Sequence, residues 1–246
     1  MLAIGAHPDD VEIGCGGILA LCAQRGLKVG LLHLTRGEAG TRGSAEQRAA
    51  EAAAAAVALG AEHRILDCGD GGLRTSREEE DQVIQALREA RPRCVLLPPA
   101  HDRHPDHERA QRLARSACFY AGLMKRPDPA GLEPHRPQLQ LSYLLHRQPE
   151  PTLVVDIGSV VDRKIAALRC YASQLTLPDA EPSEERETWV SSATFGHAVL
   201  ARSRHYGAQI GVEHGEPLLS EGPLPLLAIG EILGAARNES GPEGSF

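Results

Sequence analysis

The chain has 246 residues, enough to bury a substantial core as one α/β domain or two, and its 42% hydrophobic and 24% charged residues are ordinary for a soluble globular protein. A net charge of −7 argues against a nucleic-acid partner, and no apolar stretch approaches the length of a membrane-spanning helix. Six scattered cysteines without a Cys-x-x-Cys pair, and no evident secretory signal, predict a cytoplasmic location and no membrane partner.

Apolar runs and helix-like segments alternate along the first half of the chain. The runs at 1–4, 28–35, 64–67 and 93–97 predict strands, and the segments 13–26, 44–60, 76–90 and 107–121 have helical spacing. Capping boxes at Ser44-x-x-Gln47 and Ser76-x-x-Glu79 mark where two of these helices begin. This alternation predicts a three-layer α/β fold, with a mostly parallel, Rossmann-like sheet and helices on both faces.

The pattern is less regular beyond residue 121. Strands are expected at 139–146 and 151–156 and a helix at 160–175, whereas 125–137 holds four prolines and predicts a surface loop that borders the cleft. Segment 204–217 is polar and interrupted by glycines, so we expect it to fold back over the cleft rather than to form a core element. No linker or repeat divides the chain, which predicts one domain over 1–237 and a disordered tail over 238–246.

Two of the predicted strands run into the same tripeptide. His7-Pro8-Asp9 is followed by Asp10, and His104-Pro105-Asp106 is followed by His107. A single copy is best explained as a turn with an aspartate helix cap, but two copies at equivalent places favour chemistry. Ligands of parallel sheets bind beyond the carboxyl ends of the strands, so the two turns meet if the first and fourth strands are neighbours.

Imidazole and carboxylate groups are ligands for a zinc-type metal, and a catalytic site commonly uses three of them. His7, Asp10 and His107 would supply such a set. Asp9 and His104 would then remain free beside the metal for proton transfer. The same ligands also accept iron, cobalt or manganese, so the sequence leaves the metal open.

A glycine-rich segment, 35–44, follows the second strand, and Arg48 lies one turn into the next helix. The segment has neither phosphate-loop nor dinucleotide spacing. Two interpretations of Arg48 are open. Its guanidinium either makes a bidentate contact with an anionic or hydroxylated substrate, or it lies on a solvated helix face.

These motifs resemble those of the LmbE/PIG-L family of metal-dependent N-deacetylases, which act on N-acetylglucosamine conjugates. Ala6-His7-Pro8-Asp9-Asp10 and His104-Pro105-Asp106-His107 carry the resemblance, which extends to about residue 217. Segments 11–17, 35–38, 164–174 and 210–212 are similar to the branch that deacetylates N-acetylglucosaminyl malate in bacillithiol biosynthesis. That substrate is the expectation for this chain.

The resemblance implies roles for five residues around a metal. One zinc per chain would be bound by His7, Asp10 and His107. Asp9 would be the general base, and His104 the electropositive group beside the reacting carbonyl. The resemblance also implies a homo-oligomer, with a hexamer as one form.

Four further positions are assigned by the resemblance. Asp106 would orient His104, Arg48 would contact the sugar conjugate, and Asp70 would accept a hydrogen bond from a sugar hydroxyl. Tyr206 would lie near the oxyanion. His214 departs from the pattern, because an aromatic residue is expected there, and this puts the far end of the substrate pocket in doubt.

Other functions stay open from the sequence. The chain could be a zinc amidohydrolase acting on a mycothiol-type amide, a chito-oligosaccharide or another amino-sugar conjugate. It could also be a metal-binding or sugar-binding module without turnover, or a metal-dependent phosphoesterase, which usually has a richer carboxylate set. The presence of both Asp9 and His104 favours an enzyme that takes a small amino-sugar conjugate.

Overall fold

The computed structural model describes residues 1–127, 130–178 and 185–224. Within them, a single sheet of seven strands has the order β3-β2-β1-β4-β5-β7-β6. The strands are β1 (Leu2–Gly5), β2 (Gly30–His33), β3 (Glu62–Ile65), β4 (Cys94–Leu97), β5 (Leu139–Tyr143), β6 (Leu153–Asp156) and β7 (Gly215–Leu219). The expected tail over 238–246 lies outside the described residues.

Most of the sheet is parallel. β1 pairs in parallel with β2 and β4, while β2 pairs with β3 and β4 with β5 in the same sense. β7 runs antiparallel to both of its neighbours, β5 and β6. β1 and β4 are neighbours, with Leu2 opposite Val95, so the segments that follow them leave the same edge of the sheet.

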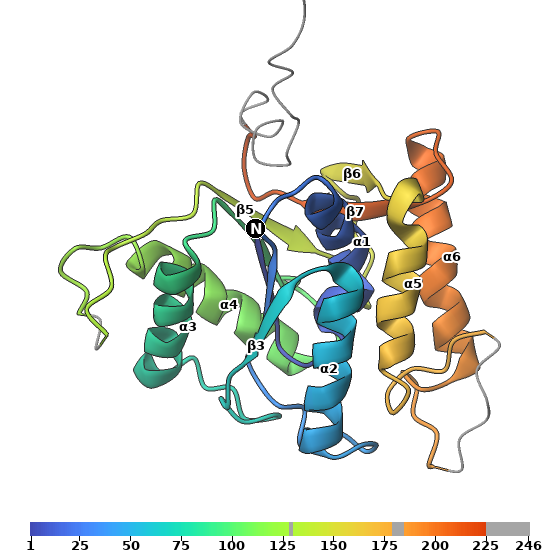
Figure 1. The fold of residues 1–246 in the computed structure, drawn as a ribbon, viewed down its shortest axis with the longest axis horizontal. Coiled ribbons are helices and arrows are strands. Elements are labelled where there is room, and N and C mark those ends of the chain that lie inside the picture. The colour runs from blue at the N-terminus through green and yellow to red at the C-terminus, as the bar shows by residue number, and fades with distance from the viewer. Residues whose placement is uncertain (128–129, 179–184, 225–246) are drawn as a thin grey trace, which may run out of the picture.

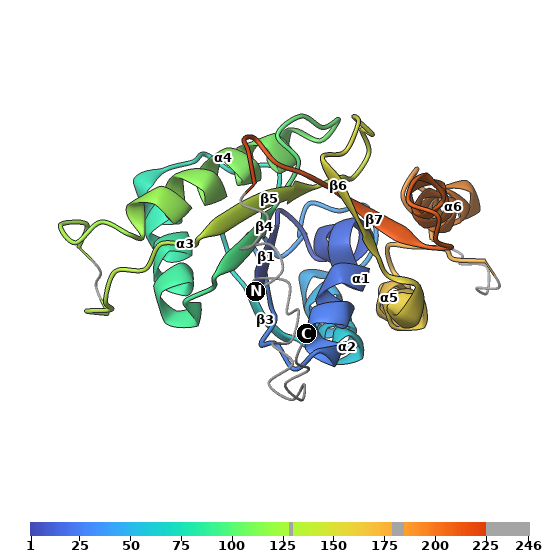
Figure 2. The ribbon, with the colours of Figure 1, turned by 90° about the horizontal axis from the view of Figure 1, so that it is seen from above.

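Helices cover both faces of the sheet (Figures 1 and 2). On one face lie α1 (Asp10–Gln24), α2 (Ala45–Leu59) and α5 (Val161–Cys170), the last preceded by the 3-10 turn η1 (Gly158–Val160). On the other face lie α3 (Arg77–Ala90) and α4 (Pro105–Tyr120). Helix α6 (Ala193–Gln209) packs on β7 at the edge of the molecule. The expected three-layer α/β fold is present.

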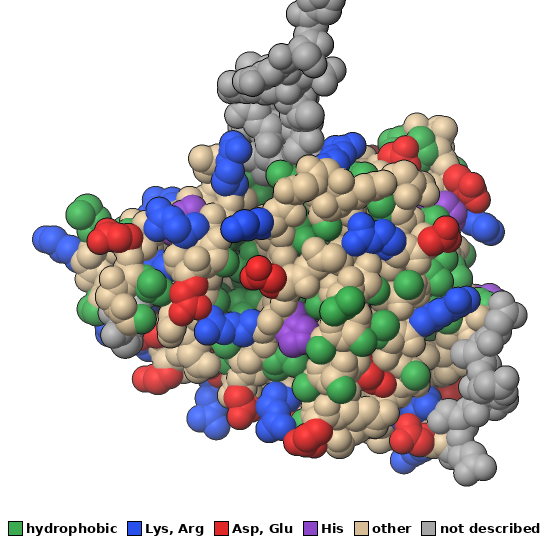
Figure 3. All heavy atoms as spheres, viewed as in Figure 1, with side chains coloured by type: hydrophobic (Ala, Val, Ile, Leu, Met, Phe, Trp, Pro, Cys, Tyr) green, Lys and Arg blue, Asp and Glu red, His purple; other side chains and the backbone are tan. Residues whose placement is uncertain are grey.

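Each side of the sheet has its own hydrophobic core. Ile18, Leu59 and Leu168 belong to the core under α1, α2 and α5, whereas Val83 and Leu113 belong to the core under α3 and α4. The strands supply residues to both cores, as expected for strands that are covered on two faces. On the face seen in Figure 3, hydrophobic side chains are scattered between basic and acidic ones.

Three expectations for the second half of the chain were wrong. Residues 204–217 are not a loop over the cleft: they contain the end of α6 and the start of β7, an inner strand of the sheet. A strand with a buried glutamate and a proline is poorly marked in sequence, because proline cannot donate a strand hydrogen bond. The helix expected to reach residue 175 ends at Cys170. Segment 125–137 does not border the cleft: it precedes β5, so it lies at the edge opposite the carboxyl ends of the strands.

No helix of the described residues is both long and apolar enough to span a membrane.

Candidate functional site

A hollow lies at the carboxyl edge of the sheet. The segments that follow β1, β2, β3, β4 and β5 all contribute to its lining. Residues named from the sequence are among those that line it: His7, Asp9, Asp10, Arg48, Asp70, His104 and His107. The neighbouring positions of β1 and β4 therefore bring the two His-Pro-Asp turns together, as the sequence predicted.

Asp10 joins the two turns. Its Oδ1 lies 3.1 Å from His107 Nε2, and its Oδ2 lies 3.4 Å from His7 Nδ1. The His7 backbone N–H also donates to Asp10 Oδ2, at 2.9 Å, which fixes the turn that starts α1. All three side chains are buried. Two imidazoles from distant parts of the chain thus face one carboxylate.

The carboxylates keep these imidazoles basic. Burial alone would lower the pKa of His7, but hydrogen bonding and the charge of Asp10, with Asp106 and Asp70 nearby, raise it well above its usual value. Burial would also lower the pKa of His107, but the charge and hydrogen bond of Asp10 outweigh this effect and raise the pKa to about 9. The pair therefore retains protons at neutral pH until a cation displaces them.

The donor set fits a divalent metal. One ring nitrogen from each of His7, His104 and His107 lies within 4.8 Å of the other two, and Asp10 touches two of these rings. His7 Nε2 and His107 Nδ1 are buried without a hydrogen bond of normal geometry. Imidazole nitrogens beside carboxylate oxygens form a zinc-type ligand set. Within the part of the chain that the structure describes, Asp102, His107 and His146 form an overlapping group, as do His7, Asp70 and Asp106.

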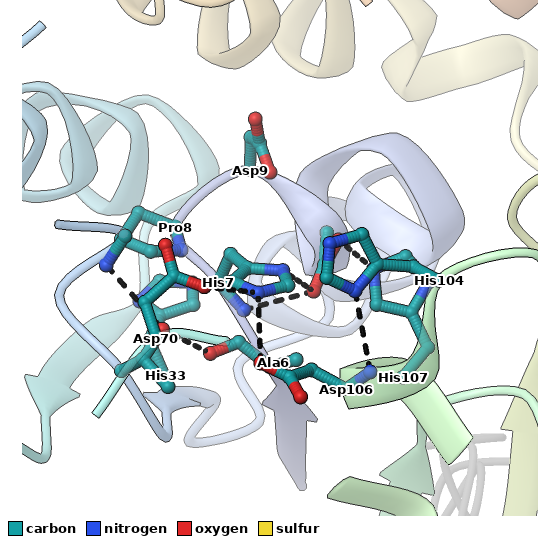
Figure 4. Close-up of polar contacts among 12 residues, drawn as sticks. Ala6, His7, Pro8, Asp9, His33, Asp70, His104, Asp106 and His107 are labelled. Atoms are coloured by element: carbon teal, nitrogen blue, oxygen red, sulfur yellow. Dashed lines mark hydrogen bonds and ion pairs between the residues drawn. The ribbon is translucent and has the colours of Figure 1, made fainter. Parts of the chain in front are cut away.

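Asp9 projects away from this cluster, above the imidazoles (Figure 4). Its backbone adopts φ 108°, ψ −29°, a left-handed conformation that non-glycine residues seldom take. Arg48 Nη2 lies 3.6 Å from Asp9 Oδ2. Burial raises the pKa of Asp9 to about 7, even though the charge of Arg48 opposes the shift. A carboxyl group of this pKa can exchange a proton near neutral pH.

His104 is held by the start of α4. Its Nδ1 accepts a hydrogen bond from the backbone N–H of Asp106 at 3.2 Å, so this side chain caps the helix. Burial, with the charges of His7 and His107, lowers the pKa of His104. The ring is therefore a neutral imidazole that carries its proton on Nε2. That tautomer can donate a hydrogen bond.

Asp106 orients more than one neighbour. Its backbone positions His104, while its carboxylate accepts from Gly71 N–H at 2.7 Å and from Arg109 at 3.0 Å. Burial alone would raise the pKa of Asp106, but the His7 imidazole 3.8 Å away, with hydrogen bonds from Arg109 and the Gly71 backbone, lowers it to about 2. Asp70 Oδ1 lies 3.0 Å from His7 Nε2, so the carboxylates of Asp70 and Asp106 both lie close to the same imidazole.

Arg48 and Tyr206 make contacts that the sequence did not suggest. The Arg48 side chain is buried, and it donates to Gly37 O at 2.9 Å and to Pro8 O at 2.7 Å. It therefore supports the loop that carries Asp9. The Tyr206 hydroxyl donates to Gln148 at 2.9 Å, and the residue lines a second, adjoining hollow. His214 contacts Ser203 and does not line the first hollow.

Sequence reasoning missed two residues of the site, Asp102 and His146. Asp102 Oδ1 lies 3.4 Å from His107 Nδ1, and Asp102 Oδ2 accepts from the His146 backbone at 3.0 Å. The His146 ring stacks on His107 with centroids 5.7 Å apart, and burial lowers the pKa of His146 to about 4. Asp102 stands two residues before the second motif, so a search for a carboxylate partner of His107 would have found it. His146 is the last residue of the strand predicted over 139–146, whereas the structure ends β5 at Tyr143 and leaves His146 free to face the site.

Helix α1, which begins at Asp10, is broken at Cys15, where φ is −147°. Lys164 donates to Ile13 O on one side of the break and pairs with Glu216. Glu216 in turn accepts from the N–H groups of Gly17 and Ile18 at 2.9 and 2.7 Å on the other side. The charged pair satisfies backbone groups that an unbroken helix would have satisfied itself.

Comparisons with known proteins place this chain in a family. Residues 2–118 match the model of the PIG-L family, GlcNAc-PI de-N-acetylase. The chain is 34% identical over 203 residues to the diacetylchitobiose deacetylase of Thermococcus kodakarensis, which covers 77% of this chain and 73% of that protein. It is 30% identical over 232 residues to a 1D-myo-inositol 2-acetamido-2-deoxy-alpha-D-glucopyranoside deacetylase of Saccharomonospora viridis, covering 73% and 87% of the two chains. The chain belongs to the PIG-L (LmbE-like) family of deacetylases, as its motifs indicated.

Two more similarities concern fold and chemistry. The structure of the conserved protein TT1542 from Thermus thermophilus superposes with a TM-score of 0.81 at 38% identity, over 91% of this chain and 95% of that one, which confirms the predicted fold class. The 4-oxalmesaconate hydratase of Pseudomonas putida is 29% identical over 195 residues, covering 70% and 73%. Relatives of this chain thus include a protein named as a hydratase.

Proposed function

We propose that this protein is a zinc-dependent hydrolase that removes the acetyl group from an N-acetylglucosamine conjugate. One observation carries the proposal. Asp10 faces both His7 and His107, and a carboxyl group of raised pKa, Asp9, lines the same hollow. This arrangement supplies ligands and a base together, which a module that only binds metal or sugar does not need.

His7, Asp10 and His107 would hold the metal. When bound there, a zinc ion would polarise the amide carbonyl and lower the pKa of a water molecule. His104 is close enough to serve as a further ligand, because its ring nitrogen belongs to the same cluster. We instead propose that His104 donates a hydrogen bond to the substrate, because its Nδ1 already accepts the Asp106 N–H and its proton is on Nε2.

Asp9 acts as the general base in this proposal. It takes a proton from the attacking water, and its raised pKa favours holding that proton while the tetrahedral species exists. Arg48 keeps the carboxylate charged at the start of the reaction, since its charge opposes the effect of burial. Protonated Asp9 then returns the proton to the departing amine.

His104 stabilises the oxyanion. The neutral imidazole donates its Nε2 proton to the oxygen that becomes negative as water adds to the amide carbon. Preorganised donors of this kind are typically worth about 3 kcal/mol. The Asp106 N–H fixes the tautomer, so the donor needs no rearrangement when charge develops.

The substrate belongs to the class of N-acetylglucosamine conjugates. The bacillithiol precursor, N-acetylglucosaminyl malate, remains the prediction made from sequence similarity to one branch. The relatives named for diacetylchitobiose and for an inositol-linked acetamido-glucopyranoside support the chito-oligosaccharide and mycothiol-type alternatives equally well. We therefore propose the shared part, an acetamido-glucopyranose with a substituent, as the group that the first hollow receives.

An acetate-release assay tests this function. The zinc-loaded protein is incubated with N-acetylglucosamine, N,N'-diacetylchitobiose, the inositol conjugate and N-acetylglucosaminyl malate. Acetate released in step with free amine supports the proposal. No acetate from any conjugate, together with hydration of 4-oxalmesaconate, would assign the chemistry of the Pseudomonas putida relative instead.

Three further properties are part of the proposal. We expect residues 1–237 to act as one domain and the protein to form a homo-oligomer, such as a hexamer, which sedimentation would measure. We expect a cytoplasmic location, in keeping with the six free cysteines.

A further inference from the structure

A second hollow adjoins the first. It is formed by α6, the turn before α6 and the segment after β5. The two hollows share Leu145, His146 and Phe195 in their linings. A ligand that fills the first hollow and is larger than one sugar ring would therefore extend along these shared residues.

A row of aromatic rings runs from the candidate metal site into the second hollow. The centroid of His107 lies 5.7 Å from that of His146, which lies 5.8 Å from Phe195, and Phe195 lies 6.0 Å from Trp189. Phe195 is buried, whereas Trp189 is 50% exposed at the end of the row. Trp189 is the only tryptophan in the chain.

The turn that carries Trp189 is fixed by hydrogen bonds. Thr188 N–H donates to Ser191 Oγ at 2.8 Å, and Ser192 Oγ donates to the Trp189 carbonyl at 2.7 Å. Ser192 also caps α6 by accepting from Phe195 N–H. Thr188 lines the first hollow and Trp189 the second. A large ring is thus held half-exposed by a hydrogen-bonded turn, so it offers a preformed contact surface at a small cost in entropy.

The rest of the second hollow is polar. Arg103, Gln148 and His205 are exposed along it. Gln148 accepts from the Tyr206 hydroxyl, which orients its amide. An aromatic face beside hydrogen-bonding side chains suits a ligand that is apolar on its ring face and polar around its rim. A pyranose ring, with C–H groups on its faces and hydroxyls at its edge, has that character.

We propose that the second hollow binds the sugar ring next to the N-acetylglucosamine unit, with Trp189 as its stacking platform. The proposal rests on the proposed function for the position of the first ring. It specifies the substrate as a disaccharide-like conjugate, and it makes Trp189 a specificity-determining residue.

Binding without turnover tests this assignment. Chitobiose with both amines free and glucosamine carry no acetyl group, so neither is hydrolysed. Each is titrated into the zinc-loaded protein while the emission of Trp189 is followed. We expect the disaccharide to shift the emission to shorter wavelength and to bind about 3- to 10-fold more tightly than glucosamine. Equal affinities with unchanged emission would overturn the proposal.

Variants separate stacking from folding. In calorimetric titrations, Trp189→Ala should abolish the preference for the disaccharide, and Trp189→Phe should restore most of it. Phe119→Ala, which removes an aromatic ring 53% exposed on α4, is the matched control and should keep the preference. A preference that survives Trp189→Ala would overturn the subsite. Acetate release is not used as a readout, so failure of the deacetylase assay and failure of this subsite are distinguishable.

Discussion

The backbone N–H of Gly17 donates to Glu216 Oε1 at 2.9 Å, across 199 residues of sequence. This contact joins β7 to the middle of α1, the helix that begins with Asp10. Glu216 and its partner Lys164 are both almost fully buried. The helix that begins with Asp10 is thus held by a charged pair that does not itself line the hollow.

Replacing Glu216 by alanine should destabilise the protein by roughly 3–5 kcal/mol, because removing one member of a buried pair leaves the other charge uncompensated. The free energy of unfolding in urea measures the loss. Glu213→Ala, at an exposed position nearby, is the control. If Glu216→Ala and Glu213→Ala had equal effects, the pair would have no structural role.

His107→Ala should lose tightly bound metal, since His107 faces Asp10 across the candidate ligand set. Elemental analysis of the purified, folded variant is the measurement. His101→Ala is the matched control, because His101 belongs to the same sequence run but its side chain is 89% exposed. One zinc per chain in folded His107→Ala would remove His107 from the ligand set.

Metal binding should release protons. The pKa values of His7 and His107 are raised in the metal-free protein, the second to about 9, so both rings hold protons at neutral pH that a metal must displace. The apparent metal affinity should rise with pH up to about 9, by about tenfold per pH unit for each proton released. Titration calorimetry in two buffers of different ionisation enthalpy counts the protons, and identical heats in both would contradict the expectation.

Asp9→Asn should keep the metal but lower turnover by about 100- to 10,000-fold, because an amide cannot accept the proton of the attacking water. Acetate release and metal content are measured on the same sample. Asp67→Asn, at an exposed position on the loop after β3, should leave turnover unchanged. Near-normal activity of Asp9→Asn would exclude Asp9 as the base.

Arg48→Met should move the acid limb of the kcat/KM profile to higher pH. The charge of Arg48 lowers the pKa of Asp9, so removing that charge raises the pKa further, by roughly one unit, and the base becomes available only at higher pH. Arg36→Met, on the loop that precedes α2, is the control, because Arg36 pairs with exposed Glu46. A change confined to KM would instead favour the substrate-contact role predicted from sequence.

The sequence predicted the parallel half of the sheet well. Strands covered on both faces give apolar runs, and the capping boxes at Ser44 and Ser76 correctly marked where α2 and α3 begin. The sequence predicted that the two His-Pro-Asp turns meet if the first and fourth strands are neighbours, and the structure shows that these strands pair.

The second half could not be predicted as well. β7 contains Glu216, whose burial becomes reasonable only once Lys164 and the broken helix α1 are placed beside it. The residue pattern left Arg48 open between a substrate contact and a solvated helix face, and the loop carbonyls that it binds come from distant residues. The partners of Glu216 and Arg48 are distant in sequence and leave no local signature. Neither arrangement could therefore be predicted from the sequence.

The left-handed backbone of Asp9 has a consequence for the stability of the protein. A glycine at this position would adopt the same conformation without strain, but it would leave the buried Arg48 guanidinium without its carboxylate partner. The two effects oppose each other, so relief of backbone strain alone does not make the loss of Asp9 favourable. If Asp9 is the base of the proposed reaction, the fold bears this strain, of about 1–3 kcal/mol, at the position where the proton is transferred.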